Sequence, residues 1–472
     1  MRRRAAGGLG RDTLVYGVGL ALQRGSSFLV LPAATRILGA RAFGEASAAL
    51  VAASFMSILF TVGINYGIVR LYFDEPRDAR RTEWAALVRV QLLLAAALAG
   101  IAWLLGPAWS DVYENIGWSS ALQAAVVLAL AQAAGATALG VLRASGRVYA
   151  FASVVATQAV VGTIVAIVLA EHHGSGGLVL GLAVGAAAGS LLGLVLSYRR
   201  PKWSATALPA GLLLSVPFVA HMLSSWVLSL FDRIVIERQL GLEELATYQI
   251  AYAVALLPVL LSDAVQTAWL PRYYGFDAAT KRGMPERLAV WVTLAGVGLA
   301  ALFVLLGPAL GRLLAPAGFG FPDTVVALVA SVTFVRAPYQ LAFAVLSDVK
   351  RSHAIAVASG IGAAVAVVAC VLLIPEWGLN GAGAATLVAY TTTSLVAVRL
   401  AERRTGSSWR LSLLLGLWAI GVAALVLVAQ LPTDVAGWTA RLAISAMTVV
   451  ALAVVLRVTR DRYRPVGAPA PA

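Results

Sequence analysis

The chain has 472 residues, of which 60% are hydrophobic and only 12% are charged, and its formal net charge is +14. Soluble domains carry about 25% charged residues, so this composition excludes an ordinary soluble enzyme and predicts a protein of the lipid bilayer. The positive charge does not indicate nucleic-acid binding, because it lies in short clusters between apolar segments and no basic–aromatic motif accompanies it.

Apolar segments of about 20 residues recur from end to end, and each is long enough to cross a bilayer as a helix. The first is too long for the core of a signal peptide, so we expect it to be retained. The single cysteine lies in another segment and excludes an intrachain disulfide. We expect about fourteen spans, at residues 13–35, 44–68, 85–106, 119–142, 149–170, 176–198, 210–232, 245–268, 288–310, 324–346, 353–375, 379–400, 411–430 and 437–457.

Lysine and arginine indicate how these spans are oriented. If the N-terminus is cytoplasmic and the spans alternate, the cytoplasmic side receives all but eight of the 36 Lys and Arg residues. The positive-inside rule therefore predicts that both termini are cytoplasmic, with residues 459–472 as a cytoplasmic tail. The exceptions lie in outer loops or in the spans and are Arg24, Arg36, Arg41, Arg233, Arg238, Arg312, Arg336 and Arg441.

The chain also repeats itself. The segment VLRASGRVYAFASVVATQ is followed by a glycine ladder, and VLSDVKRSHAIAVASG, 204 residues later, is followed by a similar ladder of small residues. Small residues at every fourth position flatten one helix face and let a neighbouring helix approach closely. The two ladders are Gly177, Gly181, Gly185 and Gly189, and Gly381, Ala385, Ala389 and Thr393.

A second pair of segments, TRILGARAFGEASAAL and DRIVIERQLGLEELATYQIA, matches at an offset near 202. Six spans per repeat is an even number, so both repeats enter the membrane from the same side and form parallel lobes. We expect an N-terminal lobe of six helices at residues 1–203, a second at 204–405, and helices 13 and 14 at 406–458.

Five segments together resemble the polysaccharide (Wzx-type oligosaccharide-lipid) flippases of the MOP (multidrug/oligosaccharidyl-lipid/polysaccharide) superfamily. They are LPAATRILGARAFGEAS, INYGIVRLYF, FDRIVIERQLGLEELATYQIAY, TAWLPRYY and LLIPEWGLNGAGAATLVAY. The resemblance implies an all-α, MATE-like membrane protein with two six-helix lobes in a V shape and two further helices. It implies transport of an undecaprenyl-diphosphate-linked oligosaccharide from the inner to the outer leaflet by alternating access.

The resemblance also implies a bacterial or archaeal cytoplasmic membrane as the location, with a polysaccharide polymerase and glycosyltransferases as partners, and we expect a monomer. Lipid II flippases and cation-coupled MATE efflux transporters of the same superfamily are the alternatives. A membrane polymerase or ligase is disfavoured, because the outer loops are too short to hold a catalytic domain. No Walker motif indicates ATP hydrolysis.

Charged residues inside the spans are the candidates for substrate binding. Arginine at the middle of a bilayer costs about 2.5–3.5 kcal/mol on insertion scales, so it faces a cavity or a partner. Arg24, near the middle of the first expected span, is our candidate for binding the diphosphate, because a guanidinium stays ionised and can bind phosphate oxygens bidentately. A structural arginine paired with a buried acid or with helix-end carbonyl groups is the alternative.

Further candidates lie within or at the ends of other spans. At span ends, snorkelling to the interface or compensation of a helix C-terminus is the alternative to substrate contact. We expect no cofactor, and His172 and His173 make a poor metal site. Asp263 is the candidate for a coupling proton or sodium ion, with an intramembrane arginine as its alternative partner. The other candidate substrate contacts are Arg36, Asn65, Arg70, His221, Asp232, Arg233 and Arg336.

Overall fold

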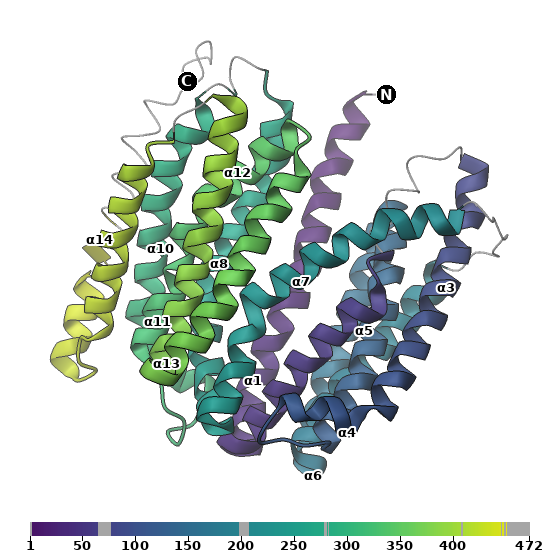
Figure 1. The fold of residues 1–472 in the computed structure, drawn as a ribbon, viewed down its shortest axis with the longest axis horizontal. Helices are drawn as coiled ribbons and strands as arrows, with labels where there is room; N and C mark the ends of the chain where they lie inside the picture. Colours follow the sequence, from purple (N-terminus) through teal and green to yellow (C-terminus); the bar gives the residue numbers. More distant parts are fainter. Residues whose placement is uncertain are drawn as a thin grey trace. The chain divides into compact units, whose positions relative to one another are not determined.

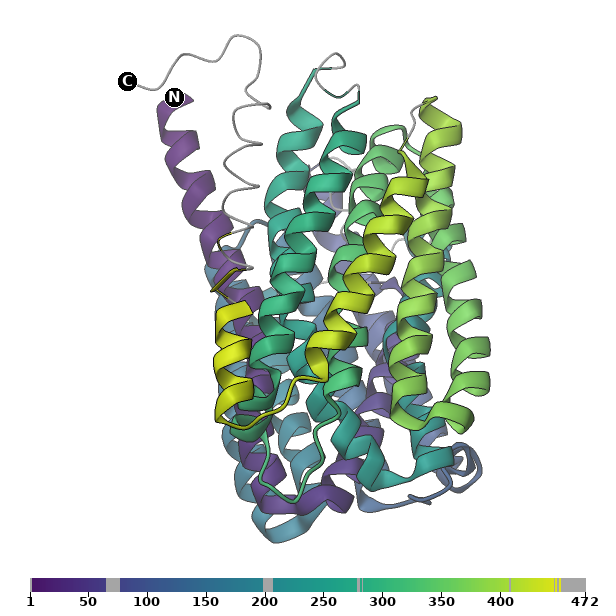
Figure 2. The ribbon, with the colours of Figure 1, turned by 90° about the vertical axis from the view of Figure 1, so that its left-hand side faces the viewer.

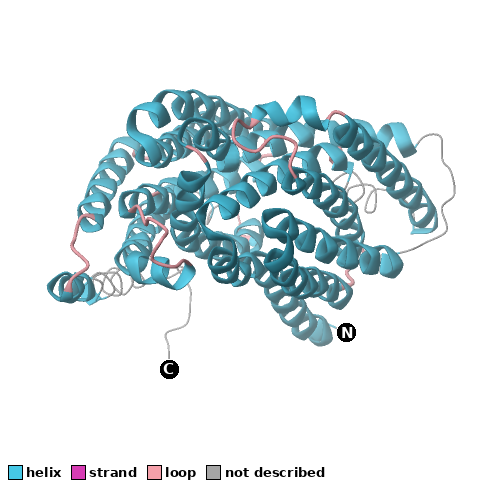
Figure 3. Cartoon of the chain, turned by 90° about the horizontal axis from the view of Figure 1, so that it is seen from below, coloured by secondary structure: helices cyan, strands magenta, loops and turns pink. Residues whose placement is uncertain are grey.

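The computed structural model describes residues 2–64, 77–197, 207–277, 281, 283–406, 409–444, 446, 447 and 450, with the side chains of 1–27 and 207–218 among those left out. Within these residues all regular secondary structure is helical (Figure 3). The helices are α1 (Arg2–Thr61), α3 (Arg77–Leu104), α4 (Gly106–Trp109), the 3-10 helix η1 (Ser110–Val112), α5 (Ser120–Ala144), α6 (Val148–Ser197), α7 (Ala207–Leu240), α8 (Leu242–Gly275), α10 (Met284–Leu314), α11 (Asp323–Ala330), α12 (Val332–Asp348), α13 (Ser352–Thr405) and α14 (Leu411–Ala429).

Three of these helices each contain two of the expected spans. In α1, α6 and α13 the helical path is interrupted at one glycine: Gly39 (φ 71°, ψ 177°), Gly174 (φ 60°, ψ −139°) and Gly378 (φ 56°, ψ −137°). The described part of the chain has 10 helical tracts that are long and apolar enough to cross a membrane. The all-helical membrane fold is therefore confirmed. The count of fourteen stays a prediction, because part of the last expected span, including residues 451–457, lies outside the described residues.

The chain divides into two compact units. Unit 1 comprises residues 1–247 and 314–319, and unit 2 comprises residues 248–313 and 320–472. The lobe boundaries expected from the sequence repeat, after residues 203 and 405, stay a prediction.

Unit 1 is built around the packing of α5 and α6 against α1, with α3 on α5 and α7 on α1 and α3 (Figure 1). Its core is apolar and combines alanines with larger side chains. One cluster joins Met56 and Phe60 of α1 to Ala95 of α3 and Val126 of α5. These buried apolar side chains hold α1, α3 and α5 together and have a structural role.

Residues 314–319 belong to unit 1 through contacts with α1. The Thr35 hydroxyl donates to the Leu314 carbonyl oxygen at 2.7 Å, and the Phe43 and Phe319 rings pack edge to face at 6.3 Å. Gly44 lies so close to Leu242 that a Cβ on Gly44 would be 2.0 Å from the Leu242 carbonyl oxygen. The two sequence segments that match at an offset near 202 therefore touch each other in this unit.

In unit 2, α13 packs against α11 and α12, and α14 packs against α11. Figure 2 shows α14 as a yellow helix in front of the green helices of this unit. Arg441, just after α14, is buried to 1% exposure and donates hydrogen bonds to the carbonyl oxygens of Leu431, Pro432 and Leu305. This arginine therefore connects the segment after α14 to α10.

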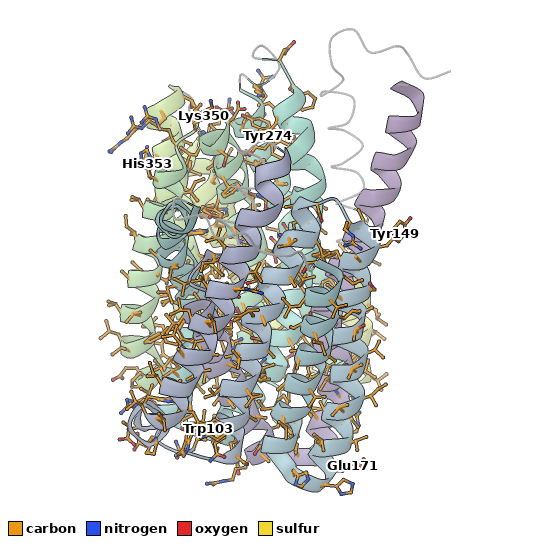
Figure 4. The ribbon with its side chains drawn as sticks, turned by 90° about the vertical axis from the view of Figure 1, so that its right-hand side faces the viewer. Trp103, Tyr149, Glu171, Tyr274, Lys350 and His353 are labelled. Atoms are coloured by element: carbon orange, nitrogen blue, oxygen red, sulfur yellow. The ribbon has the colours of Figure 1, made fainter. Side chains whose placement is uncertain are left out.

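Within each unit the spans alternate in direction as the sequence predicts. In unit 1, Trp103 at the end of α3 and Glu171 in α6 lie at one end, and Tyr149 at the start of α6 lies at the other (Figure 4). In unit 2, Tyr274 at the end of α8 lies at the same end of the unit as Lys350 and His353 beside the start of α13. Which end faces the cytoplasm stays a prediction.

The coordinates repeat with the sequence at an offset of 204 residues. A Cβ on Gly177 would lie 2.1 Å from the Leu169 carbonyl oxygen, and a Cβ on Gly381 would lie 2.0 Å from that of Leu373. Real Cβ atoms do not approach an oxygen this closely, so each hairpin depends on a glycine at this position. The interpretation of the small-residue ladders as close helix contacts is confirmed at both positions.

The same hydrogen bond also occurs in both repeats. The Ser190 hydroxyl in α6 donates to the Ala131 carbonyl oxygen in α5 at 2.8 Å, and the Ser394 hydroxyl in α13 donates to the Val335 carbonyl oxygen in α12 at 2.6 Å. Both serine residues and both acceptors are 204 residues apart. Hydroxyl-to-carbonyl bonds of this kind join helices in a medium where no hydrophobic effect does so.

The turn before each hairpin repeats its backbone conformation but not its residue. Gly146 has φ 67°, and its counterpart Lys350 has φ 55°, which is a left-handed conformation that costs a side chain about 1–2 kcal/mol. The loop geometry is therefore preserved even where the glycine that suits it is absent.

We expect Gly381→Ala to lower the free energy of unfolding by about 1–3 kcal/mol, since the added methyl group overpacks the hairpin in α13. Thermal unfolding of the purified protein in detergent measures this as a melting temperature lower by several degrees. Gly360→Ala in the same helix is the matched control, because a Cβ there meets nothing within 4 Å. Equal melting temperatures for the two variants would show that the close approach does not stabilise the hairpin.

Candidate functional site

Three of the expected substrate contacts cannot be placed in a site. Arg24 lies within α1, but its side chain is outside the described residues. Asn65 and Arg70 lie outside the described residues altogether. The roles expected for these three residues stay predictions.

Arg36 lies one turn before the Gly39 interruption of α1 and is exposed. Its Nη1 donates to the Pro32 carbonyl oxygen at 2.7 Å. This contact compensates a carbonyl group near the end of a helical segment, which is the alternative that the sequence offered for arginines at span ends. Contact with substrate stays a prediction for Arg36.

Asp232 and Arg233 form a buried ion pair near the end of α7. Arg233 Nη1 lies 2.8 Å from Asp232 Oδ1 and also donates to the Ser229 carbonyl oxygen at 2.7 Å, and the two side chains are 6% or less exposed. His221 is half-buried on the same helix, eleven residues and about 16 Å away along the axis. The structure therefore pairs Asp232 with Arg233 and leaves His221 apart from them.

Unit 2 contains a polar cluster inside its spans, formed by Ser262, Asp263 and Gln266 of α8 with Arg336 and Gln340 of α12. Arg336 Nη1 lies 2.7 Å from Asp263 Oδ1. Gln340 Nε2 donates to the same oxygen at 2.7 Å, and Gln266 Nε2 donates to the Gln340 carbonyl oxygen at 3.2 Å. A weaker contact of 3.4 Å joins the Ser262 hydroxyl to Gln340 Oε1.

The polar cluster brings together Arg336 and Asp263, which the sequence had assigned to different roles. Their side chains are 25% and 20% exposed, so the pair is accessible although both helices are membrane spans. Because the two charges cancel, Arg336 offers no net positive charge to a diphosphate, and a cation bound at Asp263 competes with a guanidinium. Both assigned roles stay predictions.

Sequence reasoning missed the uncharged members of the polar cluster, because it searched the spans for charge. A signal was present, since Ser262 and Gln266 are spaced by four residues, as are Arg336 and Gln340. Polar residues at this spacing lie on one face of a helix. Only the packing of α8 beside α12 shows that the two faces meet.

Sequence reasoning also missed Glu237, a fully buried carboxylate near the end of α7 in unit 1. It accepts hydrogen bonds from the backbone N–H groups of Asn115 at 2.7 Å and Glu114 at 3.2 Å, and the Asn115 side chain donates to the Glu237 carbonyl oxygen. Burial, and secondly the charge of Glu237, raise the pKa of the Tyr113 hydroxyl above its ordinary value. Glu237 therefore orders the loop before α5, which is a structural role.

An apolar groove of about 650 Å³ lies between α12, α13 and α14 in unit 2. None of its lining residues is charged, so it matches an apolar chain rather than a polar headgroup. The lining residues are Val335, Leu387, Thr391, Leu415, Trp418, Ala419, Val422, Ala423, Val426 and Leu427.

His172 and His173 are exposed beside the Gly174 interruption of α6. In the part of the chain that the structure describes, no three His, Cys, Asp or Glu side chains gather where they could hold a metal ion.

Apolar helices that span a membrane, with paired charges at membrane depth, define a polytopic membrane protein built like a transporter. The chain belongs to the polysaccharide biosynthesis protein family, whose sequence profile matches residues 9–274. No curated protein sequence matches it.

Solved structures share the fold. The lipid II flippase MurJ, in an inward closed conformation, superposes with a TM-score of 0.70 at 14% identity, covering 96% of this chain and 100% of that one. An inward-facing multidrug resistance MATE family transporter of the MOP superfamily gives a TM-score of 0.61 at 14% identity, covering 85% and 99%. Family and fold confirm the resemblance to MOP-superfamily polysaccharide flippases that the sequence indicated.

We expect Asp263→Asn and Arg336→Gln each to lower the free energy of unfolding by about 1–3 kcal/mol, because each leaves a charge unpaired at membrane depth. The double variant should lose less than the sum of the two, and the difference is the coupling energy of the pair. Unfolding of the four proteins in one detergent measures it.

Arg399→Gln is the control, because the Arg399–Glu402 pair is a surface pair with the arginine 65% exposed and should change stability by about 0.5 kcal/mol or less. Additive losses in the Asp263 and Arg336 variants would show that the ion pair contributes no coupling.

Proposed function

We propose that the protein is a flippase that moves a lipid-diphosphate-linked oligosaccharide from the inner to the outer leaflet of a cytoplasmic membrane by alternating access. The family match carries this proposal, since it covers residues 9–274 and concerns polysaccharide biosynthesis. The polar cluster supports it. Charged and amide groups inside apolar spans cost free energy, and in membrane proteins such groups typically mark the path of a polar substrate.

A transporter rather than an enzyme is the better interpretation of the site. The buried carboxylates Asp232 and Glu237 are engaged with Arg233 and with backbone N–H groups, and Asp263 is paired with Arg336. General acid–base catalysis needs groups that can exchange a proton with substrate, which paired structural carboxylates do not offer. The short outer loops support the same conclusion.

Arg24 is our proposed contact for the diphosphate. A diphosphate that crosses the hydrocarbon region needs compensating positive charge, and Asp263 and Asp232 already neutralise two other intramembrane arginines. Removing a bidentate, charge-assisted contact costs about 1.5–3 kcal/mol, which is roughly tenfold to a hundredfold in affinity.

Two other substrates fit the same fold, as the relatives indicate: MurJ is described as a lipid II flippase, and the MATE relative as a multidrug resistance transporter. Family membership favours a polysaccharide unit over either of them. We also propose that the flippase acts as a monomer beside the glycosyltransferases that build its substrate and the polymerase that uses its product.

We expect Arg24→Ala to lower transport at least tenfold, and Arg24→Lys to lower it less, because lysine keeps the charge but loses the bidentate geometry. Proteoliposomes loaded with a fluorescent undecaprenyl-diphosphate-linked saccharide, with a lectin added outside, measure the rate at which headgroups appear. Arg41→Ala is the control, since Arg41 is an exposed arginine after the Gly39 interruption of the same helix.

Normal transport by an Arg24→Ala protein that inserts and unfolds like the unmodified one would show that Arg24 does not bind the diphosphate. If the unmodified protein transports none of the lipid-linked saccharides tested, the proposed function is contradicted.

Ion coupling gives a separate prediction. If a proton or sodium ion drives transport through Asp263, collapsing that ion's gradient slows the unmodified protein and leaves Asp263→Asn unaffected. Vesicles in which the proton and sodium gradients are dissipated one at a time, each with both proteins, separate the two ions. Transport that continues at full rate without either gradient would contradict ion coupling.

A further inference from the structure

The polar cluster retains hydrogen-bonding capacity that its internal contacts do not use. A guanidinium has five N–H donors, and the structure gives Arg336 one hydrogen bond among the described residues, to Asp263. Gln266 uses one N–H of its amide for the Gln340 carbonyl oxygen. Unsatisfied donors and acceptors in a span cost free energy unless water or a ligand reaches them, and Arg336 is 25% exposed.

The charge of the polar cluster restricts the class of ligand. A diphosphate meets the carboxylate of Asp263 together with the guanidinium of Arg336, so attraction and repulsion largely cancel. A metal cation would be attracted by the Asp263 carboxylate and repelled by the Arg336 guanidinium, so these two effects also largely cancel. A neutral ligand has no such conflict, and the remaining N–H donors of Arg336 and Gln266 can serve it.

The arrangement of donors and acceptors restricts the ligand further. Arg336 only donates, an ionised carboxylate such as Asp263 only accepts, and the amides of Gln266 and Gln340 do both. A hydroxyl group also donates and accepts at once, so neighbouring hydroxyls can bridge such groups. These side chains lie on facing turns of α8 and α12, which are joined by the contacts from Gln340 to Asp263 and from Gln266 to Gln340.

Aromatic groups border the polar cluster. Tyr339 follows Arg336 by three residues on α12, and its ring packs against that of Phe343 with centroids 6.5 Å apart. Binding sites for small polar molecules combine apolar or aromatic walls with a few placed polar groups. A sugar ring, with hydroxyls at its edge and C–H groups on its face, matches both parts.

We propose that the polar cluster is the subsite for sugar hydroxyl groups of the transported headgroup, separate from the contact for its diphosphate. This inference rests on the proposed function, since it assumes that a lipid-linked saccharide is the cargo. It assigns the Asp263–Arg336 pair to recognition of a neutral polyhydroxylated group. Gln266 is then a specificity-determining residue.

The test compares binding of glycosylated and unglycosylated lipids to the full-length protein in nanodiscs. The ligands are undecaprenyl diphosphate, and undecaprenyl diphosphate carrying N-acetylglucosamine or galactose. We expect the unmodified protein to bind at least one glycosylated lipid more tightly than undecaprenyl diphosphate. Gln266→Leu should reduce that preference about tenfold and leave the affinity for undecaprenyl diphosphate unchanged, since the ion pair remains.

Two further variants separate hydroxyl recognition from charge and from general effects. The double variant Asp263→Asn with Arg336→Gln removes both charges and keeps groups that donate and accept, so it should retain most of the preference for the glycosylated lipid. Gln266→Ala, which removes the same amide with a smaller side chain, tests the proposal if Gln266→Leu does not fold. Thr392→Val on α13 is the control, because its hydroxyl bonds only within its own helix, to the Val388 carbonyl oxygen, and should change neither affinity.

Each other outcome overturns the inference. Equal affinity for glycosylated and unglycosylated lipids, or an unchanged preference in Gln266→Leu, shows that the polar cluster does not recognise sugar. A double variant that loses undecaprenyl diphosphate binding assigns the cluster to the anion. If the unmodified protein binds none of the three lipids, the proposed function fails with it.

Discussion

The distance between the two helices of each hairpin is the constraint on which the fold depends. In both repeats one helix approaches the other until a carbonyl oxygen, of Leu169 or of Leu373, occupies the place that a Cβ on Gly177 or Gly381 would take. Lipid surrounds these helices, so hydrophobic exclusion does not hold them together, and close packing with interhelical hydrogen bonds must do so. The serine-to-carbonyl hydrogen bonds that join α6 to α5 and α13 to α12 are such interhelical hydrogen bonds.

The lipid environment also makes charged residues inside the spans costly in free energy unless they have partners. Several charged groups inside or at the ends of the described spans have partners: Asp232 has Arg233, Asp263 has Arg336, and Arg36 contacts a carbonyl group. The Asp232–Arg233 pair is almost fully buried, whereas the pair in unit 2 is a quarter exposed. This difference in exposure, rather than charge itself, distinguishes a structural pair from a pair that a ligand can reach.

These two features connect fold to function. Closely packed hairpins are suited to a protein whose lobes move as bodies, because changes in the contacts within them are costly. The partly exposed polar cluster offers hydrogen-bonding groups for a polar ligand. Within unit 2 the cluster matches the polar headgroup of the proposed substrate, and the apolar groove matches a hydrocarbon chain.

The sequence by itself determined the membrane class, the all-helical fold and the family, and it predicted the glycine positions that recur at an offset of 204, because these depend on hydropathy, spacing and small residues that can be counted along the chain. It also predicted that Gly177 and Gly381 have the same role, as they do. It could not determine that Asp263 pairs with Arg336, since these residues are 73 positions apart. Nor could it show that Gln340 and Gln266 complete the cluster, or that Glu237 is bound by the backbone of a loop more than a hundred residues earlier. Contacts between distant residues depend on which helix faces meet, and only the tertiary structure decided that.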